Sequence, residues 1–139
     1  MEVALHLPLI PDVELVAAKA VEIVGRKLGM ARTEVEAMAV AAIEACLNAI
    51  EHGGNQGFVV RLDGGESPVG LYLAVEVEDH GGGFDPESIP VRSPSRVLGC
   101  TRKRGWGLTL IRELVDEVKV QSQPGLTTVR MVKYGGGTG

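Results

Sequence analysis

The residues best suited to chemistry lie four positions apart in an apolar stretch of the chain. Residues 41–53 read AAIEACLNAIEHG, where a carboxylate (Glu44) and an amide (Asn48) interrupt an apolar run. This spacing places both on one face of a helix. Burying them without partners costs free energy, about 1–3 kcal/mol for the amide alone. A bound metal, a water or a phosphoryl acceptor would supply partners for both side chains. Alternatively, the two side chains lie on an exposed face of the helix or form a hydrogen bond to another helix.

The element that must carry this pair is a long helix. Thr33 and Glu36 match a capping box, in which a hydroxyl and a glutamate three residues later satisfy the first backbone N–H groups. The following residues are mostly apolar, so we predict a largely buried helix from about Glu34 to His52, ending at Gly53-Gly54.

A second group of residues follows an alternating strand. Leu71 to Glu78 reads LYLAVEVE, and the chain continues with Asp79, His80 and three glycines, 81–83. Such a strand places a carboxylate at the sheet edge, followed by backbone that a ligand can approach closely. A flexible turn is the simpler alternative.

A third group is basic. Residues 88–112 contain no acid and carry five arginines and a lysine, and prolines argue against regular structure over the first part. A basic lid over a polyphosphate is one interpretation, and a solvated loop is the other. Gly105-Trp106-Gly107 follows, immediately before a helix predicted over 108–118, where free backbone N–H groups would favour an anion.

The composition limits the class of protein. The chain has 139 residues, 45% of them hydrophobic, which suits a single ordered domain. A net charge of −4 argues against nucleic-acid binding. We expect no membrane span and no signal peptide. Cys46 and Cys100 show no metal spacing, and a cytoplasmic location is the default.

The remaining elements are shorter. We predict an edge strand over 3–9, a helix opening at Pro11-Asp12 and ending at Gly29, and a strand from Phe58 to Leu62. A turn is predicted over 63–70, because it is rich in Gly, Ser and Pro. Strands at 119–123 and 127–133 flank a Pro124-Gly125 turn, and residues 135–139 form a disordered tail.

Neither a P-loop nor a dinucleotide-binding glycine pattern occurs, but the three groups in order resemble a known family. EACLNAIEHG resembles the N box, DHGGG the first glycine box and GWGL the second glycine box of the GHKL ATP-binding superfamily. The resemblance implies an α+β two-layer sandwich, the Bergerat fold, with a mixed sheet of about five strands and three helices on one face. It also implies a single domain over 1–134, with an ATP lid at about 85–104.

The resemblance implies roles around ATP and Mg²⁺. Asn48 would coordinate Mg²⁺, and Glu44 would be the general base for attack on the γ-phosphoryl group. Asp79 would accept a hydrogen bond from the adenine amino group, while Gly81 and Gly83 would let the backbone pass close to the nucleotide.

Further positions would face the phosphates and the base. The second glycine box would present backbone N–H groups to the phosphates, and one cation of 102–104 would touch them. Thr127 would lie near the adenine, although Leu126 stands where the family has Gly. The residues concerned are Arg104, Gly105, Gly107, Leu108 and Thr127.

Within the superfamily, GLTLIRELVDEV and TTVRMVKY resemble the bacterial anti-sigma-factor serine kinases. That implies a kinase for an anti-anti-sigma (STAS-type) protein that also binds a sigma factor, and a possible homodimer. The alternatives are a histidine kinase catalytic domain, a switch kinase that does not bind sigma, and a nucleotide-gated binding module with little turnover.

Overall fold

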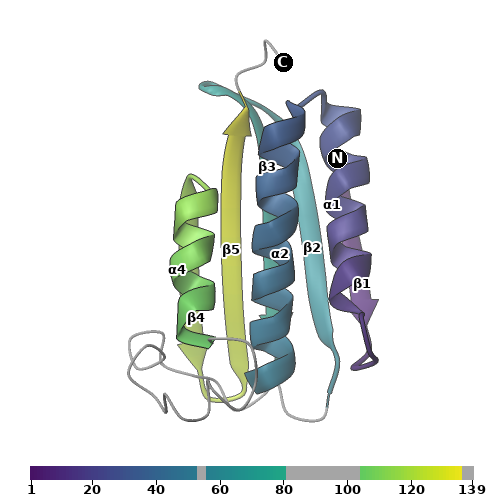
Figure 1. Ribbon diagram of the computed structural model, residues 1–139, viewed down its shortest axis with the longest axis vertical. Helices are drawn as coiled ribbons and strands as arrows, with labels where there is room; N and C mark the ends of the chain where they lie inside the picture. Colours follow the sequence, from purple (N-terminus) through teal and green to yellow (C-terminus); the bar gives the residue numbers. More distant parts are fainter. Residues whose placement is uncertain (53–55, 81–103, 136–139) are drawn as a thin grey trace.

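The computed structural model describes residues 1–52, 56–80 and 104–135, with backbone alone for His52 and 104–107. Strands and helices follow one another along the chain (Figure 1). Their bounds are β1 (Glu2–Leu7), α1 (Glu14–Leu28), α2 (Arg32–His52), β2 (Phe58–Ser67), β3 (Gly70–Asp79), α4 (Arg104–Leu114), β4 (Glu117–Gln123) and β5 (Leu126–Gly135). Within these residues no helix is both long and apolar enough to cross a membrane.

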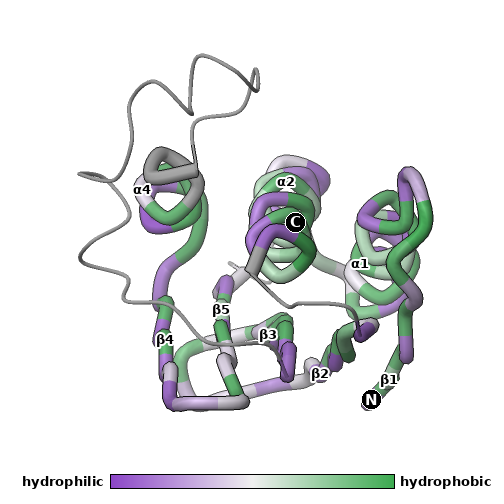
Figure 2. The backbone as a smooth tube through the Cα atoms, turned by 90° about the horizontal axis from the view of Figure 1, so that it is seen from below, coloured by the Kyte–Doolittle hydropathy of each residue, from purple (hydrophilic) through white to green (hydrophobic). Residues whose placement is uncertain are grey.

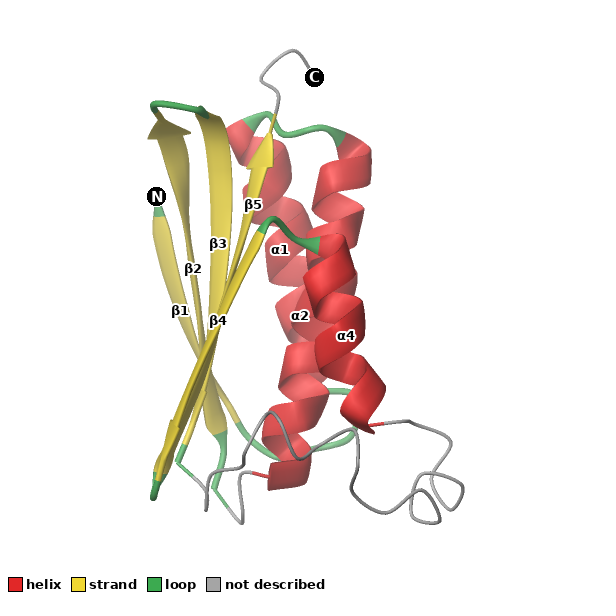
Figure 3. Cartoon of the chain, turned by 90° about the vertical axis from the view of Figure 1, so that its left-hand side faces the viewer, coloured by secondary structure: helices red, strands yellow, loops and turns green. Residues whose placement is uncertain are grey.

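The strands form one sheet in the order β1-β2-β3-β5-β4. The three helices lie side by side against one face of it, which confirms the two-layer α+β architecture (Figures 2 and 3). The expectation of a mixed sheet was wrong, because all four strand pairs are antiparallel. Short hairpins join β2 to β3 and β4 to β5, and such connections require antiparallel neighbours.

The core lies between the sheet and the central helix α2. Inward-facing residues alternate along the strands, as period-2 patterning requires. Leu73, Val75 and Val77 of β3 are buried in this way. Small residues of α2, such as Ala41 and Ala45, let the helix approach the sheet closely.

The start of α2 differs from the prediction. The helix begins at Arg32, so Thr33 lies inside it and does not cap it. The Ala31 backbone N–H donates to Glu34 Oε1 at 3.1 Å, so Glu34 rather than Glu36 makes the reach-back bond. A glutamate in the first turn also suits the positive end of the helix dipole.

The hairpin-like turn predicted over 63–70 is present but is much shorter than predicted. Residues up to Ser67 belong to β2, and only Pro68 and Val69 connect β2 to β3. The Ser67 hydroxyl donates to the Gly70 carbonyl at 2.8 Å and accepts from the Val69 N–H at 3.2 Å, which closes the hairpin. The glycines therefore serve packing within the strand rather than a turn.

Two other boundaries shift. The last helix runs over Arg104–Leu114 and not over 108–118, because Glu117 and Val118 already pair with β5. Gly135 belongs to β5 and is buried, whereas the tail after it lies outside the described residues.

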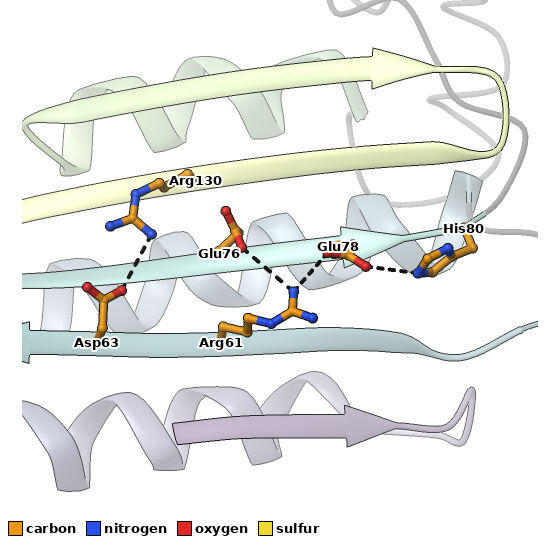
Figure 4. A network of polar contacts seen from close by, with 6 residues as sticks. All are labelled: Arg61, Asp63, Glu76, Glu78, His80 and Arg130. Carbon is orange, nitrogen blue, oxygen red and sulfur yellow. Dashed lines mark hydrogen bonds and ion pairs between the residues drawn. The ribbon is translucent and has the colours of Figure 1, made fainter. Parts of the chain in front are cut away.

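The sheet face away from the helices is polar (Figure 4). Arg61 Nη1 lies 2.8 Å from Glu78 Oε1 and 3.7 Å from Glu76 Oε1. His80 Nε2 lies 2.9 Å from the other oxygen of Glu78. The Arg61 hydrogen bond is the main reason that the pKa of Glu78 is lowered. The charged side chains of this face are therefore suited to contact with water.

Candidate functional site

The predicted site residues gather at one end of the molecule. The C-terminal end of α2, the end of β3, the start of β5 and the first turn of α4 all lie there (Figures 1 and 3). Antiparallel pairing explains part of this, because the last residue of β3, Asp79, is the partner of Thr127 near the start of β5. Residues far apart in the sequence thus share one end of the fold.

Four polar side chains are buried in the described part of the chain. They are Glu44 at 7% exposure, Asn48 at 1%, Asp79 at 2% and Thr127 at 1%. All four were predicted as site residues. Burying polar groups costs free energy, so these four residues mark this end of the molecule as the candidate site.

Asn48 has the most informative environment. Among the described residues, neither Oδ1 nor Nδ2 of its amide has a hydrogen-bond partner, although both atoms are buried. Oδ1 is the type of hard oxygen ligand that Mg²⁺ takes, and Nδ2 can donate to a phosphate oxygen. The side chain therefore fits a Mg²⁺–phosphate ligand. Glu44 lies one helical turn before it, as the spacing predicted.

Few protein ligands for a metal are present. The described residues contain no group of three or more His, Cys, Asp or Glu that could hold a metal ion. A binding mode with one protein oxygen, waters and substrate phosphates is the one that Mg²⁺ commonly adopts.

A row of residues crosses the inner face of the sheet at this end. Residues opposite each other in antiparallel strands point to the same face, so the row runs from β1 to β4. Its members are Leu7, Phe58, Asp79, Thr127 and Ser122. Leu7 and Phe58 are buried and apolar, Asp79 is a carboxylate, and Thr127 and Ser122 carry hydroxyls. The row offers an apolar surface beside an acceptor, which suits a flat heterocycle with a donor group.

The first turn of α4 contains the second glycine box. The prediction placed the two glycines before the helix. In the structure Arg104, Gly105 and Gly107 lie inside it. The first four N–H groups of a helix have no intrahelical partner, so they remain suitable for an anion. The Leu108 side chain is a core residue at 3% exposure, so only its backbone can serve the site.

Two parts of the predicted site lie outside the described residues. They are Gly81 and Gly83, and the lid at about 85–104 apart from Arg104.

Two hollows in the described part lie elsewhere. One of about 420 Å³ lies between α1 and α2 and is lined by Lys19, Arg26 and Met30 among others. Another of about 310 Å³ lies by Arg61 and Asp63. Neither includes any of the predicted site residues.

The sequence reasoning missed Phe58 and Ser122. Phe58 was assigned only to a strand, and its place beside Asp79 depends on the register of β2 with β3. Ser122 could have been found by counting, because the two-residue turn at Pro124-Gly125 makes it the partner of Thr127.

Known proteins resemble the chain over nearly its whole length. The family model for the histidine kinase-like ATPase domain matches residues 10–133. The serine-protein kinase RsbW of Bacillus velezensis is 31% identical over 141 residues, covering 95% of this chain and 84% of that protein. RsbW of Bacillus subtilis is 32% identical over 120 residues, covering 80% and 71%.

Solved structures share the fold. The RsbU and RsbW domains of Rv1364c from Mycobacterium tuberculosis match with a TM-score of 0.68 at 17% identity, over 96% of this chain and 32% of that longer one. The SiaB–SiaC complex from Pseudomonas aeruginosa matches with a TM-score of 0.61 at 12% identity, over 94% and 88%. The sequence motifs, the fold and the relatives agree, and the chain belongs to the histidine kinase-like ATPase domain family, among the relatives of the serine-protein kinase RsbW.

Proposed function

We propose that this protein is an ATP-dependent serine kinase whose substrate is a STAS-type anti-anti-sigma protein. The observation that carries the proposal is the buried, unpartnered amide of Asn48, one helical turn from Glu44. A structural asparagine in a core is normally hydrogen-bonded, so this amide is best explained by a ligand. Support also comes from relatives that are named serine-protein kinases.

Binding of ATP would use two groups of residues, one that contacts the adenine base and one that contacts the phosphates. Asp79 accepts a hydrogen bond from the adenine amino group, with Thr127 beside it and Phe58 on the other side. The α4 N-terminus faces the phosphates with the N–H groups of its first turn, which contains Gly105 and Gly107, and Arg104 adds positive charge. Asn48 would hold Mg²⁺ through Oδ1, and the ion would supply positive charge beside the phosphates.

Glu44 is the proposed general base. Its carboxylate accepts the proton of the substrate serine while the serine oxygen forms a bond to the γ-phosphorus. The bond from that phosphorus to the bridging oxygen breaks, and ADP leaves with the electron pair. Such transfer depends mainly on position and charge neutralisation, which the α2 helix supplies by holding both side chains one turn apart.

The wider partnership forms part of the proposal. We infer that the same protein binds a sigma factor, acts as a homodimer and closes a basic lid at about 85–104 over the nucleotide. These proposals follow from the resemblance to the anti-sigma-factor kinases.

The test is incubation with labelled ATP, Mg²⁺ and STAS proteins encoded in the same genome. We expect label on a serine of one of them. Glu44→Gln should reduce transfer about 100-fold or more while ATP affinity stays within about twofold. Glu36→Gln, an exposed glutamate on the same helix, is the matched control. If Glu44→Gln leaves partner capture intact and the wild type transfers no phosphate, the protein is a nucleotide-gated binding module instead.

A further inference from the structure

Ser122 makes a contact that the proposed function does not use. Its Oγ lies 3.0 Å from Oγ1 of Thr127, across the hairpin between β4 and β5. The two residues are register partners, and the Pro124-Gly125 turn fixes that register. Gly125 has φ of 85°, a left-handed value that glycine adopts without strain, so the turn is well suited to hold the strands in place.

The contact joins an exposed residue to a buried one. Ser122 is exposed, whereas Thr127 is 1% exposed and lies opposite Asp79 on the next strand. A threonine hydroxyl has one proton and two lone pairs, and its rotation decides which of them faces a neighbour. A second hydroxyl at 3.0 Å restricts that rotation, since one of the two must donate to the other.

We propose that Ser122 is a positioning residue that selects adenine over guanine. Either hydroxyl of the pair can donate, and the proposal assigns the donor role to Ser122 and the acceptor role to Thr127 Oγ1. The threonine proton then points away from β4, toward the bound base. The inference rests on the proposed function, because it assumes that a nucleobase lies against this row.

The chemistry of the two bases explains the selection. At the relevant edge adenine presents an amino donor and a ring-nitrogen acceptor, whereas guanine presents a carbonyl acceptor and a ring N–H donor. Asp79 as an acceptor and Thr127 as a fixed donor match the adenine edge. Without Ser122 the Thr127 hydroxyl rotates freely and can offer a lone pair to the guanine N–H. The preference for adenine over guanine then decreases, although Asp79 is unchanged.

The test compares ATP and GTP binding by calorimetry, with Mg²⁺ present, for the full chain. Ser122→Ala should weaken ATP binding about three- to tenfold, which corresponds to one neutral hydrogen bond, and leave GTP affinity the same or higher. The ratio of the two affinities therefore falls. Ser122→Thr keeps the hydroxyl and should restore the ratio.

Matched controls come from the opposite face of the same strands. Gln121 and Thr128 are also register partners, one position before Ser122 and one after Thr127, and they face away from the row. Gln121→Ala and Thr128→Val should leave both affinities unchanged. In a Thr127→Val background, Ser122→Ala should have no additional effect on the ratio, because the hydroxyl that it orients is gone.

The outcomes separate the two proposals. If the wild type binds ATP and Ser122→Ala keeps the wild-type ratio, or if its effect adds fully to that of Thr127→Val, the positioning role is overturned and the kinase proposal stands. If the wild type binds no adenine nucleotide, both are overturned. A fall in thermal stability without a change in the ratio would indicate a purely structural contact and would also overturn the inference.

Discussion

Asp79 and Thr127 face each other across β3 and β5 and are buried to 2% and 1% exposure. One comes from the first glycine box and the other from the C-terminal hairpin. Antiparallel pairing brings their side chains to the same face, with Cβ atoms about 5 Å apart in such pairs. This pairing by itself brings the two proposed base-recognition residues side by side.

Replacing the carboxylate should weaken adenine binding. Asp79→Asn keeps the size of the side chain but loses a charged acceptor, so we expect ATP affinity to fall about 10- to 100-fold, since a hydrogen bond to a charged group contributes about 1.5–3 kcal/mol. Calorimetry with ATP and Mg²⁺ measures this. Asp63→Asn, which changes an ion pair with Arg130 and a hydrogen bond from the Tyr72 hydroxyl on the outer face, should bind ATP like the wild type. Equal affinity in both variants would contradict the role of Asp79.

Replacing the unpartnered amide should have opposite effects on stability and binding. Asn48→Leu removes two buried polar atoms that have no partner, so the free energy of unfolding without nucleotide should rise by about 1 kcal/mol. Binding of ATP with Mg²⁺ should be lost. Urea denaturation and calorimetry measure the two effects.

Asn48→Asp is the companion variant. It keeps an oxygen ligand but buries a charge, so we expect lower stability that Mg²⁺ partly restores. A large loss of stability in Asn48→Leu would show that the amide has a structural partner.

Two adjacent glycines in β2 should tolerate alanine very differently. A Cβ on Gly64 would lie 2.4 Å from Leu28 Cδ1 and 2.9 Å from the Tyr72 carbonyl oxygen, so Gly64→Ala should destabilise the protein by about 1–3 kcal/mol. A Cβ on Gly65 would meet only Tyr72 Cε1 at 3.7 Å. Gly65→Ala should therefore be neutral or slightly stabilising. Thermal unfolding compares them, and equal melting temperatures would refute the packing argument.

The outer-face ion pair predicts a pH dependence. The Arg61 hydrogen bond lowers the pKa of Glu78 below its ordinary value of 4.5, so the stabilisation is complete above that value and is lost as pH falls through the lower, folded-state pKa. The difference in unfolding free energy between wild type and Glu78→Gln should shrink as pH falls below about pH 4.5. Glu113→Gln, on the exposed face of α4, is the control. A difference that grows on acidification would have the wrong sign.

Local patterns predicted the elements that carry the site. Alternation over 71–78 located β3 and left Asp79 at its end, and the spacing of Glu44 and Asn48 placed them one turn apart on α2. These features depend on short-range periodicity, which the sequence displays directly. The sequence left burial of Glu44 and Asn48 open and gave no prediction of burial for Asp79 and Thr127, whereas the structure buries all four.

Features that depend on contacts between elements were not predictable. Gly64 is a glycine within strand β2 because Leu28 of α1 occupies the space where a side chain would lie. The local sequence of residues 64–67, GGES, gives no indication of that contact. The place of α4 is set by burial of Leu108 and Ile111 against the core, which overrides the low helix propensity of the glycines in its first turn. Ser122 and Phe58 join the site through strand register, which emerges only with the sheet.

The inward-facing residues of β3 have a consequence for how this protein can change. Leu73, Val75 and Val77 belong to the core, and Asp79 is the next inward position, roughly 7 Å further along the strand. Along β3, apolar packing thus ends two residues before the proposed recognition residue. On this strand, thermal stability and ligand preference therefore depend on different positions, and a new nucleobase preference could be engineered at Asp79 while Leu73, Val75 and Val77 stay unchanged.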